Sequence, residues 1–206
     1  MLYSACVQEN LELVDTLLNL GANPTCYYVG KKGPLQIAAK KGNIKLLKRL
    51  LQAGVPIDND IKGTALYCAS AKGNIDIIDY LIDHGANIDQ RMQSINCAGT
   101  ALMIACERKQ VDAVQRLLDA GADVNIISTY TRTAFIHACI GGNSEIFDKL
   151  IIHGANINDP KCERTPLFVA SYHGNIEIVR KLINLGVDIN EQKKHFQYDT
   201  LNGSCK

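Results

Sequence analysis

The sequence lacks several features that would point to particular functions. In its 206 residues, no apolar run approaches the roughly 20 residues that a membrane-spanning helix needs, so we expect no membrane insertion. The first residues show no basic segment followed by an apolar one, and therefore no secretory signal. The formal net charge is only +1, from 22 basic and 21 acidic side chains, which argues against a surface built as a whole for nucleic acid. We therefore expect a cytoplasmic location, with the nucleus as an alternative.

Sequence signatures of catalysis and of metal or cofactor binding are also missing. The chain has eight cysteines but no C-x-x-C pair, which argues against a zinc site and a thioredoxin-type site. No H-E-x-x-H motif, Walker-type loop or G-x-G-x-x-G after a strand occurs. We therefore predict a protein that is not an enzyme and has no catalytic residues, no cofactor and no metal site. The simplest interpretation of the cysteines is free thiols in a reducing cytosol.

What the sequence does contain is an internal repeat. Six Leu- or Ile-rich segments end in Gly followed by Ala or Val, at Gly21, Gly54, Gly85, Gly121, Gly154 and Gly186. A second motif precedes five of these glycines: GPLQIAA from Gly33, TALYCAS from Thr64, TALMIAC from Thr100, TAFIHAC from Thr133 and TPLFVAS from Thr165. Self-similarity at a nearly fixed period predicts a repeat architecture.

Each part of the repeat has a physical role in a pair of helices. The Thr that opens the second motif can cap a first helix, and Pro34 and Pro166 occupy the position where a missing N–H costs nothing. A following Gly-Asn pair predicts the end of that helix, with the Asn capping the next one. The second helix is predicted from apolar residues spaced as in Ile176, Val179 and Leu182, and the closing Gly ends it.

This pattern resembles the ankyrin repeat over residues 1 to about 190. The resemblance implies an all-α solenoid of stacked helix-turn-helix units, joined by turn or β-hairpin loops, in which neighbouring units bury each other's apolar faces. We place the repeats approximately at 1–24, 25–57, 58–88, 89–124, 125–157 and 158–190. Residues 191–206 are interpreted as a C-terminal cap, a partial repeat or a tail.

The sequence departs from the family pattern at several places. The family usually has a His in the second motif that ties adjacent repeats together, and this chain has Tyr3, Gln36, Tyr67, Met103, Ile136 and Phe168 there. We therefore expect stability to depend on packing more than on that hydrogen bond. Lys109 replaces the Gly that ends the first helix in other repeats. The loop from Gln90 to Ala98 is longer than its counterparts and is either slack or a partner contact.

Six of the eight thiols fall into two groups by their place in the repeat. Cys6, Cys106 and Cys139 align at a small-residue position between helices, which predicts buried and unreactive thiols. His137 lies two residues from Cys139, a spacing at which helical side chains do not face each other, so a Cys-His dyad is not expected. The cysteines in turns are expected to be the exposed ones, namely Cys26, Cys97 and Cys162.

Basic residues gather between Lys31 and Arg49, with no acidic residue among them. Alignment of the repeats places Lys45 between Glu12 and Asp76, and Lys48 between Asp15 and Asp79, which predicts surface ion pairs that neutralise much of this patch. Four lysines lack such partners and remain candidates for binding an acidic partner: Lys31, Lys32, Lys40 and Lys41.

In ankyrin proteins the concave groove is lined by turn tips and by the ends of the first helices. Carried onto this sequence, the resemblance places exposed Tyr and Arg residues there, and these are the types most often found at interface hot spots. The candidate partner-binding residues are Tyr130, Arg132, Tyr172, His173, Arg108, Lys31, Lys32, Lys40 and Lys41. The alternative is that these side chains are simply solvated surface.

The resemblance implies a monomeric protein-binding scaffold that recognises a macromolecular partner, most simply another protein, on this groove and its loop tips. An alternative is that the chain is the targeting module of a larger protein, such as an enzyme or a microbial effector acting in the cytosol of a host cell. A third interpretation, binding of nucleic acid or phosphoinositide through the Lys31–Lys41 region, ranks lower because the overall charge is balanced.

Overall fold

The computed structural model describes residues 1–26, 32–59, 63–94 and 97–191. In this part, twelve helices follow one another as six consecutive pairs. The first helices of the pairs are α1 (Leu2–Gln8), α3 (Pro34–Lys41), α5 (Ala65–Ser70), α7 (Ala101–Glu107), α9 (Ala134–Gly141) and α11 (Pro166–Tyr172). The second helices are α2 (Leu11–Asn19), α4 (Ile44–Gln52), α6 (Ile75–Asp83), α8 (Val111–Asp119), α10 (Ser144–Ile152) and α12 (Ile176–Asn184).

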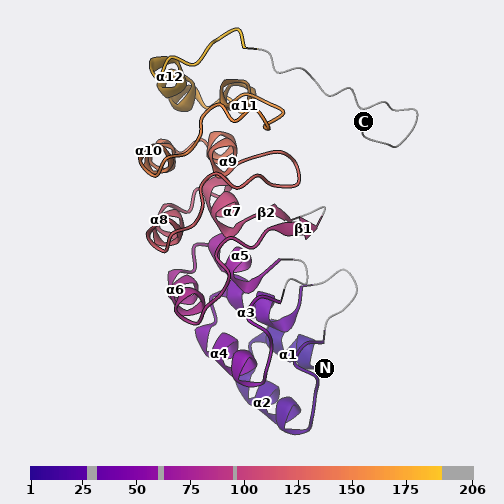
Figure 1. Cartoon of the computed structure of the whole chain (residues 1–206). Helices are drawn as coiled ribbons and strands as arrows, with labels where there is room; N and C mark the ends of the chain where they lie inside the picture. Colours follow the sequence, from indigo (N-terminus) through magenta and orange to yellow (C-terminus); the bar gives the residue numbers. More distant parts are fainter. Residues whose placement is uncertain (27–31, 60–62, 95–96, 192–206) are drawn as a thin grey trace, which may run out of the picture.

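The pairs stack into a curved, elongated array with two columns of helices (Figure 1). The first helices form one column, called the inner column here, in which each contacts the first helix of the next pair. The second helices form the outer column. Loops project from the side of the inner column, and Figure 1 shows the hairpin β1 (Met92–Ser94) and β2 (Cys97–Gly99) among them. The predicted all-α repeat solenoid is confirmed.

The predicted helix starts are also confirmed. Thr64, Thr100, Thr133 and Thr165 each accept a hydrogen bond from the backbone N–H three residues later, which satisfies one of the unpaired donors at a helix start. In α3, Gly33 offers no side-chain cap, and Pro34 begins the helix instead.

Residues in the left-handed conformation follow the first helices. Gly42 and Gly142, both with φ of 79°, end α3 and α9 as predicted. Lys109, which replaces the usual Gly, adopts the same region with φ of 59°, and Glu9 adopts it after α1 with φ of 58°. The repeat geometry therefore imposes this conformation even where no glycine is present.

The asparagines between paired helices have two different roles. Asn43 and Asn143 accept N–H groups of α4 and α10, as the sequence predicts. For Asn74 and Asn175 the predicted capping role is wrong. Their side-chain amides instead donate to carbonyls at the end of the preceding inner helix, Ala39 at 2.6 Å and Cys139 at 2.7 Å. Helix ends leave such carbonyls unpaired, so these two asparagines fasten one pair to the next.

A continuous core of buried residues runs through the stack, from Leu2 to Val187. Met103 and Ile136 occupy the repeat position where the family usually has a His, and both are buried in the core as expected. Gln36 is an exception to the expectation, because its side-chain amide donates a 2.6 Å hydrogen bond to the backbone carbonyl of Asn59 in the next loop. Gln36 thus retains a polar contact at this position.

The apolar pattern predicted for α12 is only partly buried. Leu182 is fully buried, but Ile176 is 63% exposed and Ile183 is also exposed. In a stacked array each helix pair covers its predecessor, and α12 is the last described helix. Its outward apolar side chains are therefore open to solvent in the described part of the chain.

The buried thiols confirm one prediction and correct another. Cys6, Cys106 and Cys139 are fully buried, and burial raises the pKa of Cys6 to about 11 and that of Cys139 to about 12. Such thiols stay protonated at neutral pH and are poor nucleophiles. The expectation that Cys162 is exposed is wrong, because it packs into the core with 5% exposure. Cys26 is half-buried, and the side chain of Cys97 lies outside the described part.

The long loop after α6 contains an antiparallel hairpin, in which Met92 pairs with Gly99. Met92 is buried in the core, so the base of this hairpin is anchored and is not slack. The hairpin belongs to the loop type that the resemblance implies.

At Gly141 two inner helices, α7 and α9, approach each other closely. A Cβ atom at this position would lie 2.6 Å from the carbonyl oxygen of Cys106 and 3.1 Å from that of Glu107. These are backbone atoms, which move only if α7 and α9 separate. We expect Gly141→Ala to lower the free energy of unfolding by about 1–3 kcal/mol, as measured by urea denaturation followed by circular dichroism.

The matched control is Lys72→Ala, which changes an exposed side chain at the equivalent end of α5. Its effect should stay within about 0.5 kcal/mol, as for most surface substitutions. Equal stabilities of wild type and Gly141→Ala would show that the two helices do not need this close approach.

Candidate functional site

The loop tip before α9 presents two of the predicted binding residues, Tyr130 and Arg132. The backbone N–H of Ser128 donates to the Arg132 carbonyl at 2.8 Å, and the N–H of Thr131 donates to the Ser128 carbonyl at 3.0 Å. The buried Ser128 hydroxyl accepts the Arg132 N–H at 3.2 Å. These bonds close residues 128–132 into a tight turn, from which Tyr130 projects with 47% of its surface exposed.

Thr131 within this turn has φ of 52°, in the left-handed region. A β-branched residue rarely adopts that conformation, and strain of this kind costs on the order of 1 kcal/mol. The surrounding hydrogen bonds maintain it, and the Thr131 hydroxyl adds a 2.8 Å bond to the Tyr130 carbonyl. The turn is therefore a fixed platform for its neighbours.

A shallow hollow lies between this turn and the loop before α11. Tyr130 and Arg132 line it from one side, and Glu163 and Arg164 from the other. Ile136 and Val169, from α9 and α11, also line it. The hollow therefore joins two successive helix pairs on the inner column. Arg164, a turn-tip residue outside the predicted partner-binding set, belongs to it.

Two further predicted binding residues, Tyr172 and His173, lie at the end of α11. Tyr172 is 74% exposed, and its ring lies 6.2 Å from that of Phe168 and 5.3 Å from that of His173, between ring centroids. The Arg164 guanidinium lies 5.0 Å from the Phe168 centroid, over the ring. Arg164 and Phe168 thus connect the hollow to Tyr172 and His173. We call Tyr130, Arg132, Arg164, Phe168, Tyr172 and His173 the aromatic–arginine surface.

Phe168 was assigned to packing by its position in the repeat, yet 49% of its surface is exposed. The equivalent Gln36 is buried, because it bonds to the loop that follows its helix pair. For α11 the residue equivalent to Asn59 is Glu191, which is the last one that the structure describes. The exposure of Phe168 follows from its place in the last described pair, a signal that the repeat alignment contained.

A partly buried polar contact joins α7 and α9 and was not predicted from the sequence. The carboxylate of Glu107 accepts a 2.9 Å hydrogen bond from Nδ1 of His137, which is 7% exposed. Because an ionised carboxylate only accepts hydrogen bonds, Nδ1 carries the proton. This bond lowers the pKa of Glu107, and the nearby guanidinium groups of Arg108 and Arg132 lower it further. Arg108 itself is exposed at the end of α7.

The predicted lysine region is only partly as expected. Lys41, predicted to lack a partner, forms a 2.8 Å ion pair with Glu9 on the preceding pair. Lys32 also has a partner, the Cys68 sulfur at 3.0 Å. Lys40 is exposed, without an ion pair among the described residues. Lys31 lies outside the described residues.

The prediction that Lys45 and Lys48 form ion pairs with acidic residues of the adjacent helices is wrong for the described residues. Arg49, the neighbour of Lys48, is the residue that pairs with Asp15. Lys48 lies over the ring of Tyr80, 4.7 Å from its centroid. Lys45 forms no ion pair in the part of the chain that the structure describes. The helix phase, which one-dimensional alignment does not resolve, directs Arg49 and not Lys48 toward α2.

Among the described residues, no three His, Cys, Asp or Glu side chains come together in a way that could hold a metal ion. No described helix has the length and apolar character required to cross a bilayer.

Comparison with protein families decides the identity of this architecture. The family model described as ankyrin repeats (3 copies) matches residues 2–92, 35–128 and 102–193. The chain belongs to the ankyrin-repeat family. A search of curated proteins gives no match to it. Ankyrin repeats are generally protein–protein interaction modules and are typically non-catalytic, so the coarse expectation of a binding protein agrees with the family.

The Glu107–His137 contact should make stability depend on pH. The pKa of Glu107 is lowered from its ordinary value of 4.5, so the fold favours the ionised form. The contact therefore stabilises the ankyrin array above about pH 4.5, and this stabilisation is lost as the pH falls through the lowered pKa. We expect Glu107→Gln to be less stable than wild type near neutral pH, with the difference disappearing under acid conditions.

Urea denaturation of both proteins across a pH series measures this difference. Glu163→Gln, which removes an exposed carboxylate without an ion pair among the described residues, is the control and should follow the wild type throughout. A difference between wild type and Glu107→Gln that is the same at every pH would contradict the predicted role of the ionised carboxylate.

Proposed function

We propose that this ankyrin array binds another protein through its aromatic–arginine surface. The observation that carries the proposal is that Tyr130 and Tyr172 are large, exposed side chains on the inner column, each beside an exposed arginine or histidine. Tyr and Arg dominate the energetics of protein interfaces, because they combine a large contact area with directed hydrogen bonds. Neither tyrosine is part of the buried core.

The preorganisation of the surface supports the same proposal. Binding costs free energy whenever mobile side chains or loops must be ordered. Here the turn of residues 128–132 is held by its own hydrogen bonds, and the Phe168 and Tyr172 rings lie nearly parallel, with an interplanar angle of 14°. A partner would therefore find much of this surface already arranged.

A binding role also fits the chemistry of the buried thiols. Cys6 and Cys139 have pKa values raised by burial to about 11 and about 12, so they stay protonated at neutral pH. A nucleophilic thiol needs the opposite shift, toward the thiolate. The scaffold interpretation thus accounts for these cysteines as packing residues.

The first test is affinity capture from cell lysate with mass spectrometry, comparing wild type with a variant in which Tyr130, Arg132, Tyr172 and His173 are changed to Ala. We expect the variant to keep its circular dichroism spectrum and to retain its partner about tenfold less well or worse, as for loss of several hot-spot residues. The lost protein would then be confirmed by titration with the purified partner.

The matched control changes two apolar and two arginine side chains, all exposed on the outer column, to Ala: Leu20, Ile152, Arg116 and Arg180. This control should capture the same protein as wild type. Equal capture by the inner-column variant and wild type would place the binding site away from the aromatic–arginine surface.

A second variant tests whether the fixed turn of residues 128–132 contributes to binding, separately from the contacts made by its side chains. Ser128→Ala removes the hydroxyl that accepts the Arg132 N–H, while Tyr130 and Arg132 remain. We expect affinity for the captured partner to fall about two- to tenfold, because the loop must then be ordered on binding. Thr129→Ala, an exposed hydroxyl in the same loop, should leave the affinity unchanged. Equal affinities of Ser128→Ala and wild type would show that the turn is not held for binding.

A further inference from the structure

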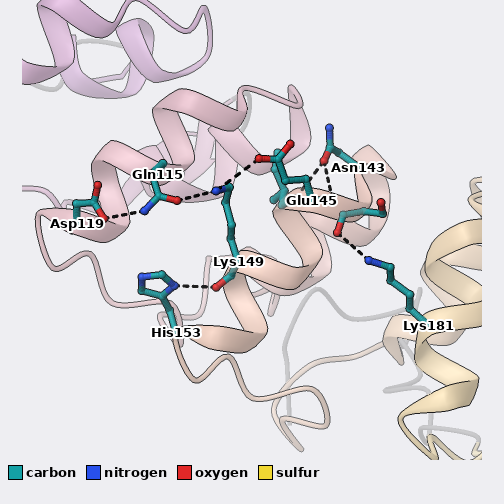
Figure 2. Close-up of polar contacts among 9 residues, drawn as sticks. Gln115, Asp119, Asn143, Glu145, Lys149, His153 and Lys181 are labelled. Carbon is teal, nitrogen blue, oxygen red and sulfur yellow. Dashed lines mark hydrogen bonds and ion pairs between the residues drawn. The ribbon is translucent and has the colours of Figure 1, made fainter.

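The two columns of the array differ in how many of their basic side chains form ion pairs. On the outer column, several basic side chains pair with acidic or amide groups of adjacent outer helices, although Lys45 and Lys48 of α4 form no ion pair among the described residues. Arg116 lies 3.7 Å from Asp79, and Lys181 lies 2.5 Å from Asp148. Lys149 donates to Gln115 at 2.7 Å, and Figure 2 shows this contact with that of Lys181 along α8, α10 and α12. The outer column therefore neutralises much of its own charge.

The inner column and its loops leave most of their cations unpaired. Six exposed basic side chains there have no ion pair in the described residues: Lys40, Lys72, Arg108, Lys109, Arg132 and Arg164. The two carboxylates at the ends of inner helices already have partners, Glu9 with Lys41 and Glu107 with His137. The ends of the inner helices thus carry an excess of unpaired cations, while the loops between the helix pairs also carry carboxylates such as Asp159 and Glu163.

Cations and aromatic rings coincide at one end of this face. Arg132 and Arg164 line the same hollow, and the nearest acidic side chain in it is Glu163. The Phe168 and Tyr172 rings continue from Arg164 along α11. A ligand on this surface thus meets two guanidinium groups and then two stacked rings.

These observations indicate the chemistry of the partner. We infer, on the basis of the proposed function, that the aromatic–arginine surface binds an extended acidic segment of the partner protein. Carboxylates of the segment face Arg132 and Arg164, which offer paired N–H donors suited to carboxylate oxygens. An apolar side chain of the segment packs on Phe168 and Tyr172. Arg108, one helix pair away, extends the attraction toward the middle of the array.

The dimensions of the array suit such a segment. Packed helices lie about 8–10 Å apart, so α7, α9 and α11 together span about 20 Å. An extended chain rises about 3.3 Å per residue, so about six residues cross this distance. A nucleic acid fits less well, because its binding depends on many phosphate contacts and the chain as a whole has a net charge of only +1.

Selection from a displayed library of random peptides, about 12 residues long, tests the chemistry with the full chain as bait. We expect the enriched peptides to contain more Asp and Glu than the unselected library, together with an apolar residue. Arg132→Glu combined with Arg164→Glu should bind the acidic peptides at least tenfold more weakly and select basic ones instead. Neutral Arg132→Gln with Arg164→Gln should weaken the acidic peptides without selecting basic ones.

The control variants separate failure of this inference from failure of the proposed function. Peptides that lose binding in Tyr172→Ala but show no excess of acidic residues would overturn the acidic partner and leave the binding surface in place. Enriched peptides that bind wild type, Tyr172→Ala and both arginine variants equally, or no enrichment at all, would overturn both. A single-stranded oligonucleotide that displaces the selected peptides and binds more tightly would replace the acidic segment with nucleic acid.

Discussion

Burial between neighbours is the constraint on which the rest of this structure depends. A single pair of helices exposes an apolar side that it cannot cover, so every pair needs the next one. The core therefore continues from Leu2 to Val187 without a boundary. Where the described stack ends, the same constraint leaves Ile176, Ile183 and Phe168 exposed. Position in the array, and not residue type, decides which of the equivalent side chains reach solvent.

Polar contacts fix how neighbouring helix pairs are oriented, which apolar burial alone does not. Asn74 and Asn175 donate to carbonyls of the preceding inner helix, and Gly141 lets α9 approach α7 until backbone atoms nearly touch. On the outer column, ion pairs join adjacent helices at the surface, where each contributes little by itself. Packing thus supplies most of the stability, while the asparagine bonds and the close approach at Gly141 specify how neighbouring pairs are aligned.

Local chemistry repeated along the chain made the helix pairs predictable from the sequence, because a Thr cap or a left-handed residue acts within one turn. Contacts between repeats were less predictable. Asn43 and Asn74 occupy the same repeat position and both bond to the preceding helix pair, but to different groups, and only Asn43 also caps its own helix. Glu107 and His137 lie 30 residues apart in the sequence, and only the stacking of α7 on α9 brings them together. For the candidate site, exposure of Tyr130 and Tyr172 was predictable, whereas the linking roles of Arg164 and Phe168 depend on distances between helix pairs.

The distribution of charge follows from the same geometry. Outer helices carry acidic and basic residues at neighbouring positions, so stacking brings opposite charges together, as for Asp79 and Arg116. The loops of the inner column place Met92 and Cys162 in the core, but their exposed side chains are not required for burial. Arg132 and Arg164 can therefore remain unpaired without loss of core stability. Solvation alone would be served equally well by either sign of charge, so the unpaired cations at the ends of the inner helices support the acidic partner proposed above.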